Sequence, residues 1–199
     1  MRRRRLSLCA KIEGLTQQEE LHPLQITTQT LGILKQLSFR EKCRDCIDKL
    51  TMADESFQKE FLESHNSYRA LHHAPPLTFN SELTAAAQKW ADECLKKRCM
   101  GHSNSEDGEN VYYMQSQKPI KLTGKEAVDS WYSEIKDYLF NKPGSQPKTG
   151  HFTQVVWKDT KELGVGLATD GNTVIVVGQY RPPGNYTNKG QFENNVLPK

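Results

Sequence analysis

The sequence predicts an α/β protein with a three-layer α-β-α sandwich, preceded by an N-terminal extension. Segments whose apolar residues recur at helical spacing alternate with short segments rich in β-branched residues. The run from Val174 to Val177 is β-branched throughout, which is typical of a strand covered on both faces. A sheet covered on both faces needs one layer of helices on each side, and the three-layer arrangement follows.

Composition changes near Met52, and we interpret residues 1–52 as an extension that is disordered or partly helical, with a helix around 31–50. Residues 53–199 are interpreted as the folded domain. The extension carries ten basic and six acidic residues, whereas the domain carries 17 and 18 and is nearly neutral. A nearly neutral domain argues against a broad nucleic-acid-binding surface. Because no apolar run approaches about 18 residues, we expect no membrane-spanning helix.

Two amphipathic helices open the domain. Asp54 or Ser56 can cap the first helix, and Pro75 follows its end. Asn80 can cap the second helix after a short extended segment, LTFN. Their apolar stripes are Phe57, Phe61, Tyr68 and Leu71 in the first, and Leu83, Ala87, Trp90, Ala91 and Cys94 in the second.

The second half of the domain predicts a third helix and most of the sheet. Thr123 and Glu126 have the spacing of a capping box, which starts a helix whose apolar face continues to Tyr138. A strand is expected at 111–114, and LGVGLATDGNTVIVVGQYR predicts two strands joined by a turn at 170–172. We expect the apolar residues of the C-terminal tail to pack onto the domain, namely Phe192, Val196 and Leu197.

The N-terminus and the cysteines indicate the cellular compartment of the protein. Arg2 to Arg5 precede an apolar stretch that is too short for a secretory signal, and Arg2 excludes N-myristoylation. These arginines either lie in a solvated end or form a patch for anionic surfaces. The five cysteines are an odd number, and Cys43 and Cys46 form only half of a zinc motif. Free thiols in a reducing compartment are therefore expected.

Four ionisable residues stand beside strongly apolar sequence. They are His102 and Glu109 in the loop GHSNSEDGEN, Glu134 in the third helix, and His151 in GHFTQVVWKDT. Buried ionisable groups need partners, so we expect these four to satisfy one another in a single cleft. The alternative is structural: histidines that are satisfied within the fold, and glutamates whose hydrogen bonds fix the loop and the third helix.

Other polar and aromatic residues are assigned structural roles. We expect His65, Asn66 and Arg69 to pack or hydrogen-bond inside the fold, and His72 and His73 to be exposed at a helix end. The three tryptophans are assigned to the core: Trp90, Trp131 and Trp157.

Four motifs together resemble the CAP superfamily, which comprises cysteine-rich secretory, antigen 5 and pathogenesis-related proteins. The motifs are GHFTQVVWKDT (150–160), VVGQYRPPGNY (176–186), HNSYR (65–69) and GENV (108–111). The segments WYSEIKDYLF, LGVGLA and ENNVLP are similar to the Golgi-associated plant pathogenesis-related subfamily. The resemblance covers residues 53–199 and implies an α-β-α sandwich with a wide central cleft.

The resemblance also implies what the cleft binds. His102, Glu109, Glu134 and His151 would be the cleft tetrad, with the two histidines holding a divalent metal such as zinc that the fold does not require. Tyr112 and Tyr113 are candidates for a lipid- or sterol-accepting groove; the alternative is a strand that packs them on the core. The implied partners are an acidic phospholipid or sterol-like lipid, a protein, or a second copy of the chain.

These features favour a non-catalytic binding protein at the cytosolic face of an internal, Golgi-type membrane. A zinc-dependent hydrolase or peptidase is the alternative, with Glu109 or Glu134 as general base. Related intracellular members carry a serine shortly after GEN, where this chain has Tyr112 to Gln115, so a serine nucleophile is not expected. A secreted, extracellular protein is a further alternative, but Gly178 replaces the cysteine that is usual in secreted members.

Overall fold

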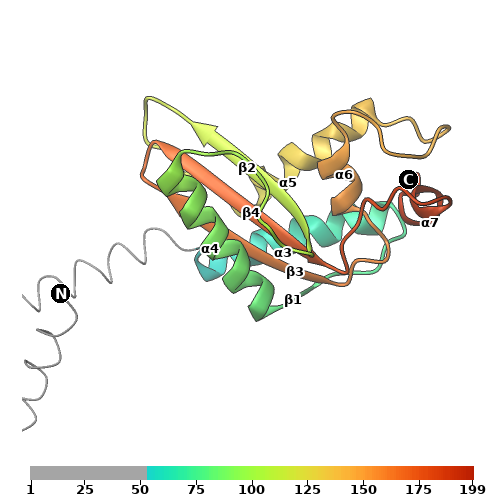
Figure 1. Cartoon of the computed structure of the whole chain (residues 1–199), viewed down its shortest axis with the longest axis horizontal. Coiled ribbons are helices and arrows are strands. Elements are labelled where there is room, and N and C mark those ends of the chain that lie inside the picture. Colours follow the sequence, from blue (N-terminus) through green and yellow to red (C-terminus); the bar gives the residue numbers. More distant parts are fainter. Residues whose placement is uncertain (1–52) are drawn as a thin grey trace, which may run out of the picture. The chain divides into compact units, whose positions relative to one another are not determined.

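The computed structural model describes residues 53–199 (Figure 1). The predictions for residues 1–52 lie outside the described residues: the helix at 31–50, the arginine patch and the Cys43–Cys46 motif. The domain boundary at residue 52 likewise stays a prediction.

A mixed four-stranded sheet forms the middle layer, with strand order β1-β3-β4-β2. The strands are β1 (Thr78–Phe79), β2 (Gly108–Gln115), β3 (Glu162–Thr169) and β4 (Thr173–Arg181). β3 and β4 form a hairpin and β2 pairs antiparallel with β4, whereas β1 pairs parallel with β3. β4 is buried along nearly its whole length, as its β-branched run predicts. β2 extends beyond the predicted 111–114 at both ends.

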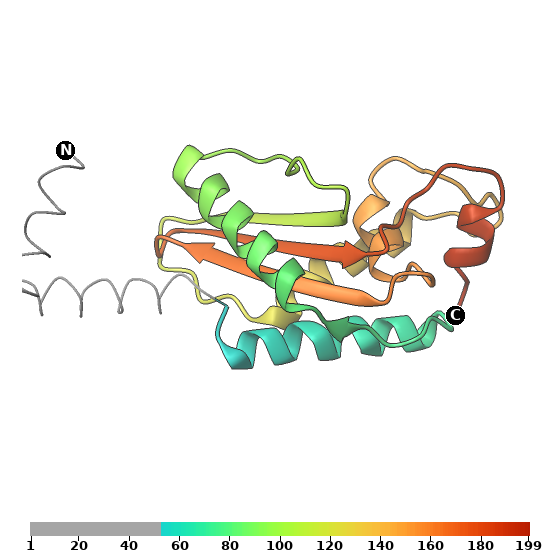
Figure 2. The same ribbon diagram turned by 60° about the horizontal axis from the view of Figure 1, so that its bottom comes forward.

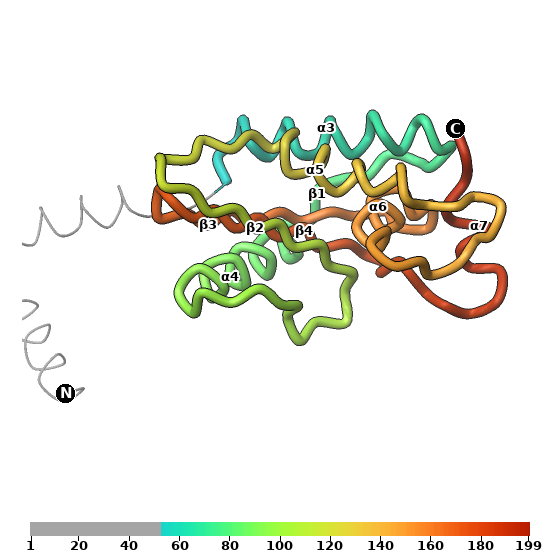
Figure 3. Tube along the Cα trace, turned by 90° about the horizontal axis from the view of Figure 1, so that it is seen from above, coloured from blue at the N-terminus to red at the C-terminus, as the bar shows by residue number. Residues whose placement is uncertain are grey.

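Helices cover both faces of the sheet, which confirms the three-layer prediction. α3 (Glu55–Leu71) and α5 (Gly124–Tyr132) lie on one face, and α4 (Ser81–Lys97) lies on the other, as Figures 2 and 3 show. Each face buries its own apolar cluster, with Phe61 and Trp131 on the α3 side and Ala87 and Ile175 on the α4 side. Burial of these clusters is the main favourable contribution to folding.

Two glycines let α4 pack very closely on β3. Gly164 and Gly166 are two residues apart and therefore share one face of the strand. A Cβ atom at Gly164 would overlap the backbone at Leu83 and Thr84, and one at Gly166 would overlap the backbone of Ala87. The alternation of glycine in LGVGLA is therefore required by contact between a helix and a strand, not by a turn.

The helix caps follow the sequence closely. The side chain of Asp54 accepts a hydrogen bond from Phe57 N, and that of Asn80 accepts from Glu82 N and Leu83 N. Thr123 and Glu126 form the complete capping box at the start of α5. The third helix is shorter than predicted, because α5 ends at Tyr132 and continues as the 3-10 helix η1 (Ser133–Asp137).

The C-terminal tail packs on the domain, as predicted. Phe192 and Val196 are buried, and Phe192 on α7 (Gln191–Asn195) packs edge-on against Trp157. The prediction that His72 is exposed is wrong, whereas His73 is exposed. His72 lies between Tyr132 Oη at 2.9 Å and the carbonyl oxygen of Leu197 at 2.6 Å. Both partners are distant in the sequence, so local spacing gives no sign of this burial.

The three tryptophans differ in burial. Trp131 and Trp157 are buried in the first cluster, as predicted, whereas Trp90 is only partly buried and packs beside the second. Trp90 Nε1 donates to the carbonyl oxygen of Gly101 at 3.0 Å, which attaches the loop after α4 to that helix.

Candidate functional site

His102 and Glu109 form a hydrogen-bonded pair where β2 begins. Glu109 is the second residue of β2, and His102 lies in the loop that precedes the strand. His102 Nδ1 lies 3.0 Å from Glu109 Oε1, and because a carboxylate only accepts, Nδ1–H is the donor. The Glu109 side chain is 5% exposed, whereas the His102 side chain is 68% exposed. The carboxylate is thus fixed in the protein and the imidazole faces solvent.

Glu109 is held by three further hydrogen bonds. Ser103 donates its backbone N–H to Oε1 at 2.8 Å and its hydroxyl to Oε2 at 2.6 Å. Gln179 Nε2 donates to Oε2 at 3.3 Å from the opposite position on β4. These four bonds fix the orientation of the carboxylate, and the carboxylate in turn orients His102.

His151 and Glu134 form a second pair of the same kind. His151 is the second residue of α6 (Gly150–Val155), and its Nδ1 donates to Glu134 Oε1 at 2.7 Å. The other oxygen of Glu134 accepts from the backbone N–H groups of His151 at 3.0 Å and Phe152 at 3.1 Å. Thr149 provides no side-chain cap, so Glu134 on η1 satisfies the amides at the start of α6.

Asn110 links the two pairs. It follows Glu109 on β2, and its Nδ2 donates to the carbonyl oxygen of His151 at 3.1 Å. Among residues 53–199, no hydrogen bond or ion pair joins one pair directly to the other. The four predicted residues therefore form two His–Glu pairs on either side of Asn110.

Both histidines present the same nitrogen outward. Because Nδ1 carries the proton in each ring, the lone pair lies on Nε2, and neither Nε2 atom takes part in a hydrogen bond within residues 53–199. A carboxylate on Nδ1 with a free Nε2 is the arrangement of metal-binding histidines. The described residues contain no cluster of three or more His, Cys, Asp or Glu able to hold a metal.

The histidine in HNSYR belongs to a buried network, as predicted. His65 Nδ1 donates to the carbonyl oxygen of Phe61 at 2.8 Å, and Nε2 accepts from Tyr180 Oη at 2.8 Å. Burial lowers the pKa of His65 to about 3, so the ring is neutral. Asn110 Nδ2 lies 3.3 Å from Tyr180 Oη, which connects this network to the strand that carries Glu109.

Asn66 and Arg69 are also structural, as predicted. The side chain of Asn66 accepts from the backbone N–H of Leu77 and donates to its carbonyl oxygen. Arg69 is fully buried and donates only to backbone carbonyl oxygens. They belong to Pro75, Val155, Trp157 and Thr160. Arg69 therefore attaches the end of α6 and the segment after it to α3.

The two tyrosines proposed for a lipid groove lie on opposite faces of the sheet. Tyr112 packs against the cluster under α3, and Tyr113 packs against the cluster under α4. Adjacent residues of a strand point to opposite sides, so both rings cannot line one groove. A groove shared by Tyr112 and Tyr113 is therefore wrong, and the packing alternative describes them better.

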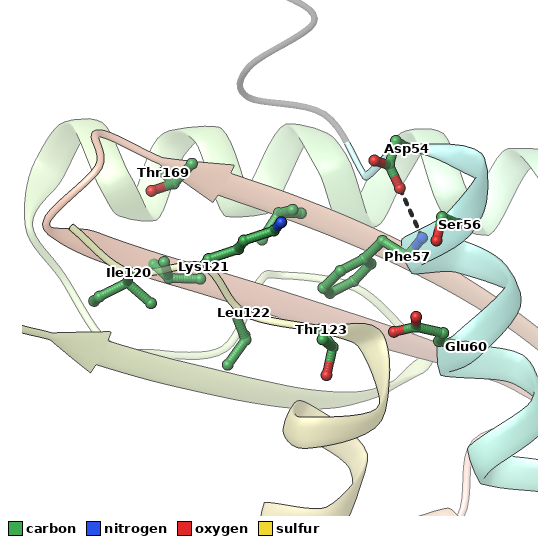
Figure 4. Close-up of a pocket in the computed structure, with 11 residues that line it drawn as sticks. Asp54, Ser56, Phe57, Glu60, Ile120, Lys121, Leu122, Thr123 and Thr169 are labelled. Carbon is green, nitrogen blue, oxygen red and sulfur yellow. Dashed lines mark hydrogen bonds between the residues drawn. The ribbon is translucent and has the colours of Figure 1, made fainter.

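A separate pocket of about 540 Å³ lies between the start of α3 and the segment before α5 (Figure 4). Its apolar walls come from Phe57, Ile120, Leu122, Leu167 and Val174. Its polar and charged residues are Asp54, Ser56, Glu60, Lys121, Thr123 and Thr169. None of the four His and Glu residues lines it.

The sequence did not indicate Ser103, Asn110, Gln179 or Trp131 as parts of the site. Gln179 faces Glu109 across the β2–β4 pair, which only the strand register reveals. Trp131 stacks on the His151 ring with centroids 6.3 Å apart and planes 12° apart. Ser103 follows His102 directly, and this adjacency is the one signal that could have indicated it.

The model of the CAP family, described as the cysteine-rich secretory protein family, matches residues 62–180. Golgi-associated plant pathogenesis-related protein 1 of Homo sapiens is 43% identical over 152 residues, which is 73% of this chain and 96% of the relative. Protein PRY2 of Saccharomyces cerevisiae is 37% identical over 145 residues, 71% of this chain and 41% of the relative.

Solved structures agree with these matches. The structure of BmVAL-1 superposes with a TM-score of 0.55 and 26% identity, over 72% of this chain and 82% of that one. Within residues 53–199, every helix is too short or too polar to traverse a lipid bilayer. The family model spans more than half of the sequence and the human relative is matched over nearly its whole length, so the chain belongs to the CAP family.

Proposed function

We propose that this chain is a non-catalytic binding protein whose two His–Glu pairs can hold a divalent metal and whose pocket beside α3 accepts a sterol-like lipid. The observation that carries the metal site is the free Nε2 on each of two imidazoles that are oriented by a carboxylate. Two imidazoles suit zinc, and water can complete its coordination. When bound, the metal would supply a positive charge at the exposed side of the two pairs.

The hydrogen bonds of the two glutamates favour binding over hydrolysis. A general base needs a lone pair that can reach a substrate proton. Glu109 already accepts four hydrogen bonds, from His102, Ser103 and Gln179. Glu134 accepts three, all from His151 and Phe152. Both carboxylates thus use most of their acceptor sites to position other groups, which supports binding over hydrolysis.

The composition of the pocket favours a neutral lipid. Five apolar side chains form part of its walls, and its volume of about 540 Å³ lies within the usual range for small-molecule sites. Asp54 and Glu60 contribute two acidic groups against one basic group, Lys121. Repulsion from the two carboxylates disfavours the headgroup of an acidic phospholipid, so a sterol-like molecule fits better.

The proposed location is the cytosolic face of an internal, Golgi-type membrane. Two findings support it: 43% identity to a human protein named Golgi-associated, and free thiols at Cys94 and Cys99. Unpaired cysteines are usual where thiols are kept reduced.

Titration with zinc tests the metal site. We expect the His151→Ala variant to bind zinc at least about tenfold more weakly than the parent, because one of two imidazole ligands is removed. His73→Ala is the matched control, since His73 is exposed and lies outside the site. Isothermal titration calorimetry of both variants gives the affinities. Equal zinc affinity in His151→Ala and the parent would contradict the assignment.

Binding of dehydroergosterol, a fluorescent sterol, tests the pocket. We expect Leu122→Asp to weaken binding at least about tenfold, because it places a charge against the apolar walls. Leu139→Asp is the control, since Leu139 is 56% exposed and outside the pocket. In parallel, flotation measures binding of the protein to phosphatidylserine vesicles. Binding to those vesicles but not to the sterol would show that an acidic lipid is the ligand, contrary to the proposal.

A further inference from the structure

The C-terminus of α4 brings two cysteines together. Arg98 follows the last residue of the helix in the left-handed conformation, with φ of 52°. Its N–H donates to the carbonyl oxygen of Leu95, and the N–H of Cys99 donates to that of Cys94 at 3.2 Å. This pair of bonds defines a Schellman motif, in which the side chains at the first and last of its six positions meet. Here those side chains are Cys94 and Cys99.

The two sulfur atoms lie 3.8 Å apart, and both thiols are free. Cys94 is fully buried in the apolar cluster under α4, whereas Cys99 is partly exposed at its edge. A disulfide needs a sulfur separation of about 2.05 Å, so the sulfurs must approach by roughly 1.7 Å. The backbone turn already holds the two residues side by side, and side-chain rotation provides the remaining movement.

We propose that Cys94 and Cys99 form a reversible disulfide that fixes the start of the loop carrying His102. The oxidant is a small disulfide such as oxidised glutathione. The Cys99 thiolate attacks one sulfur of that molecule, forms a mixed disulfide and releases one glutathione thiolate. Cys94 then loses its proton, attacks the Cys99 sulfur and releases the second glutathione thiolate. Two protein thiols are oxidised, and one glutathione disulfide becomes two glutathione thiols that take up the two protons.

The environments of the two thiols set this order. Burial and the contact with Cys99 raise the pKa of Cys94 to about 12, so its thiol is a poor first nucleophile. Cys99 is the residue that a solvent-borne disulfide can reach. Once Cys99 carries glutathione, the adjacent Cys94 is the thiol placed to resolve it.

The disulfide would act on the site through a short segment. His102 is three residues beyond Cys99, and the intervening Gly101 is held by Trp90 on α4. In the reduced chain this hydrogen bond and the Schellman motif attach the segment to the helix. A disulfide between Cys94 and Cys99 would prevent this segment from separating transiently from α4. Its effect on a metal at His102 rests on the proposed function, whereas disulfide formation does not.

Mass spectrometry of the full chain tests the link. The variant used has Cys9, Cys43 and Cys46 replaced by serine, so that only Cys94 and Cys99 can react. It is treated with oxidised glutathione in the folded state, alkylated and digested with trypsin. Because Lys96, Lys97 and Arg98 separate the two cysteines, trypsin places them on different peptides. We expect those peptides to be joined after oxidation and separated again by dithiothreitol.

Hydrogen exchange tests the consequence without any metal or lipid. We expect amide exchange in residues 100–104 to slow at least about threefold on oxidation, and not to change in a Cys99→Ser control. A stable glutathione adduct on Cys99 without joined peptides would refute the disulfide. Joined peptides with unchanged exchange would refute its action on the loop. Neither result bears on zinc or sterol binding, so failure here is distinct from failure of the proposed function.

Discussion

Replacing Arg69 by alanine is expected to lower the free energy of unfolding by about 4 kcal/mol. The guanidinium is fully buried and donates to four backbone carbonyl oxygens at 2.8–3.1 Å. Removal leaves these oxygens without their donor and opens a cavity. Arg69→Lys keeps the charge but not the planar fork of donors, so an intermediate loss is expected. Urea denaturation of both variants measures the loss.

Lys59→Ala is the control for Arg69, because the Lys59 side chain is 74% exposed and makes one weak ion pair along α3. The free energy of unfolding of Lys59→Ala should differ from that of the parent by less than about 0.5 kcal/mol. If Arg69→Ala does not fold, Arg69→Lys still provides the measurement. A loss below about 1 kcal/mol in Arg69→Lys would show that the buried hydrogen bonds contribute little.

Acidification from pH 7 to pH 4 is expected to destabilise the fold by about 3 kcal/mol through His65 alone. Burial lowers its pKa from 6.5 to about 3 in the folded protein. Between these values the unfolded chain binds the proton and the folded chain does not. The contribution of neutral His65 to the free energy of unfolding is therefore fully present above pH 6.5 and is lost as the pH falls. Burial also lowers the pKa of His72, which acts in the same direction.

His65→Gln separates this contribution from that of the carboxylates. The variant cannot titrate at this position, so its loss of stability between pH 7 and pH 4 should be smaller than that of the parent by about 3 kcal/mol. Chemical denaturation at both pH values measures the difference. Equal losses in variant and parent would contradict the prediction. If the variant is unfolded at pH 7, an NMR titration of the parent shows whether His65 stays neutral at pH 4.

Much of the fold could be predicted because its elements are encoded locally. Asp54, Asn80 and Thr123 cap helices through their own neighbours, so composition near each start is sufficient. The buried strand was equally clear from the run that begins at Val174. The early end of α5 at Tyr132 could not be predicted, because the apolar face continues into η1 without a break in its spacing.

The sequence identified four His and Glu residues as candidates, but it did not predict how they pair. His102 and Glu109 are seven residues apart in the sequence, whereas Glu134 and His151 meet only through the packing of η1 on α6. Which glutamate serves which histidine depends on that packing. The roles of Gln179 and Asn110 depend on strand register and on contacts between distant segments. Pattern alone also placed Tyr112 and Tyr113 together, although the pleat separates them.

The parallel stacking of Trp131 on His151 gives the molecule an optical property. An imidazole ring that gains a positive charge or a cation draws electron density from the adjacent indole, and the indole is a fluorophore. Trp131 also touches the buried His65 ring at an angle of 63°, so one chromophore lies between a histidine that faces the site and one sealed in the interior. Trp131 is therefore placed to respond to a charge gained by the His151 ring, against the emission of Trp90 and Trp157.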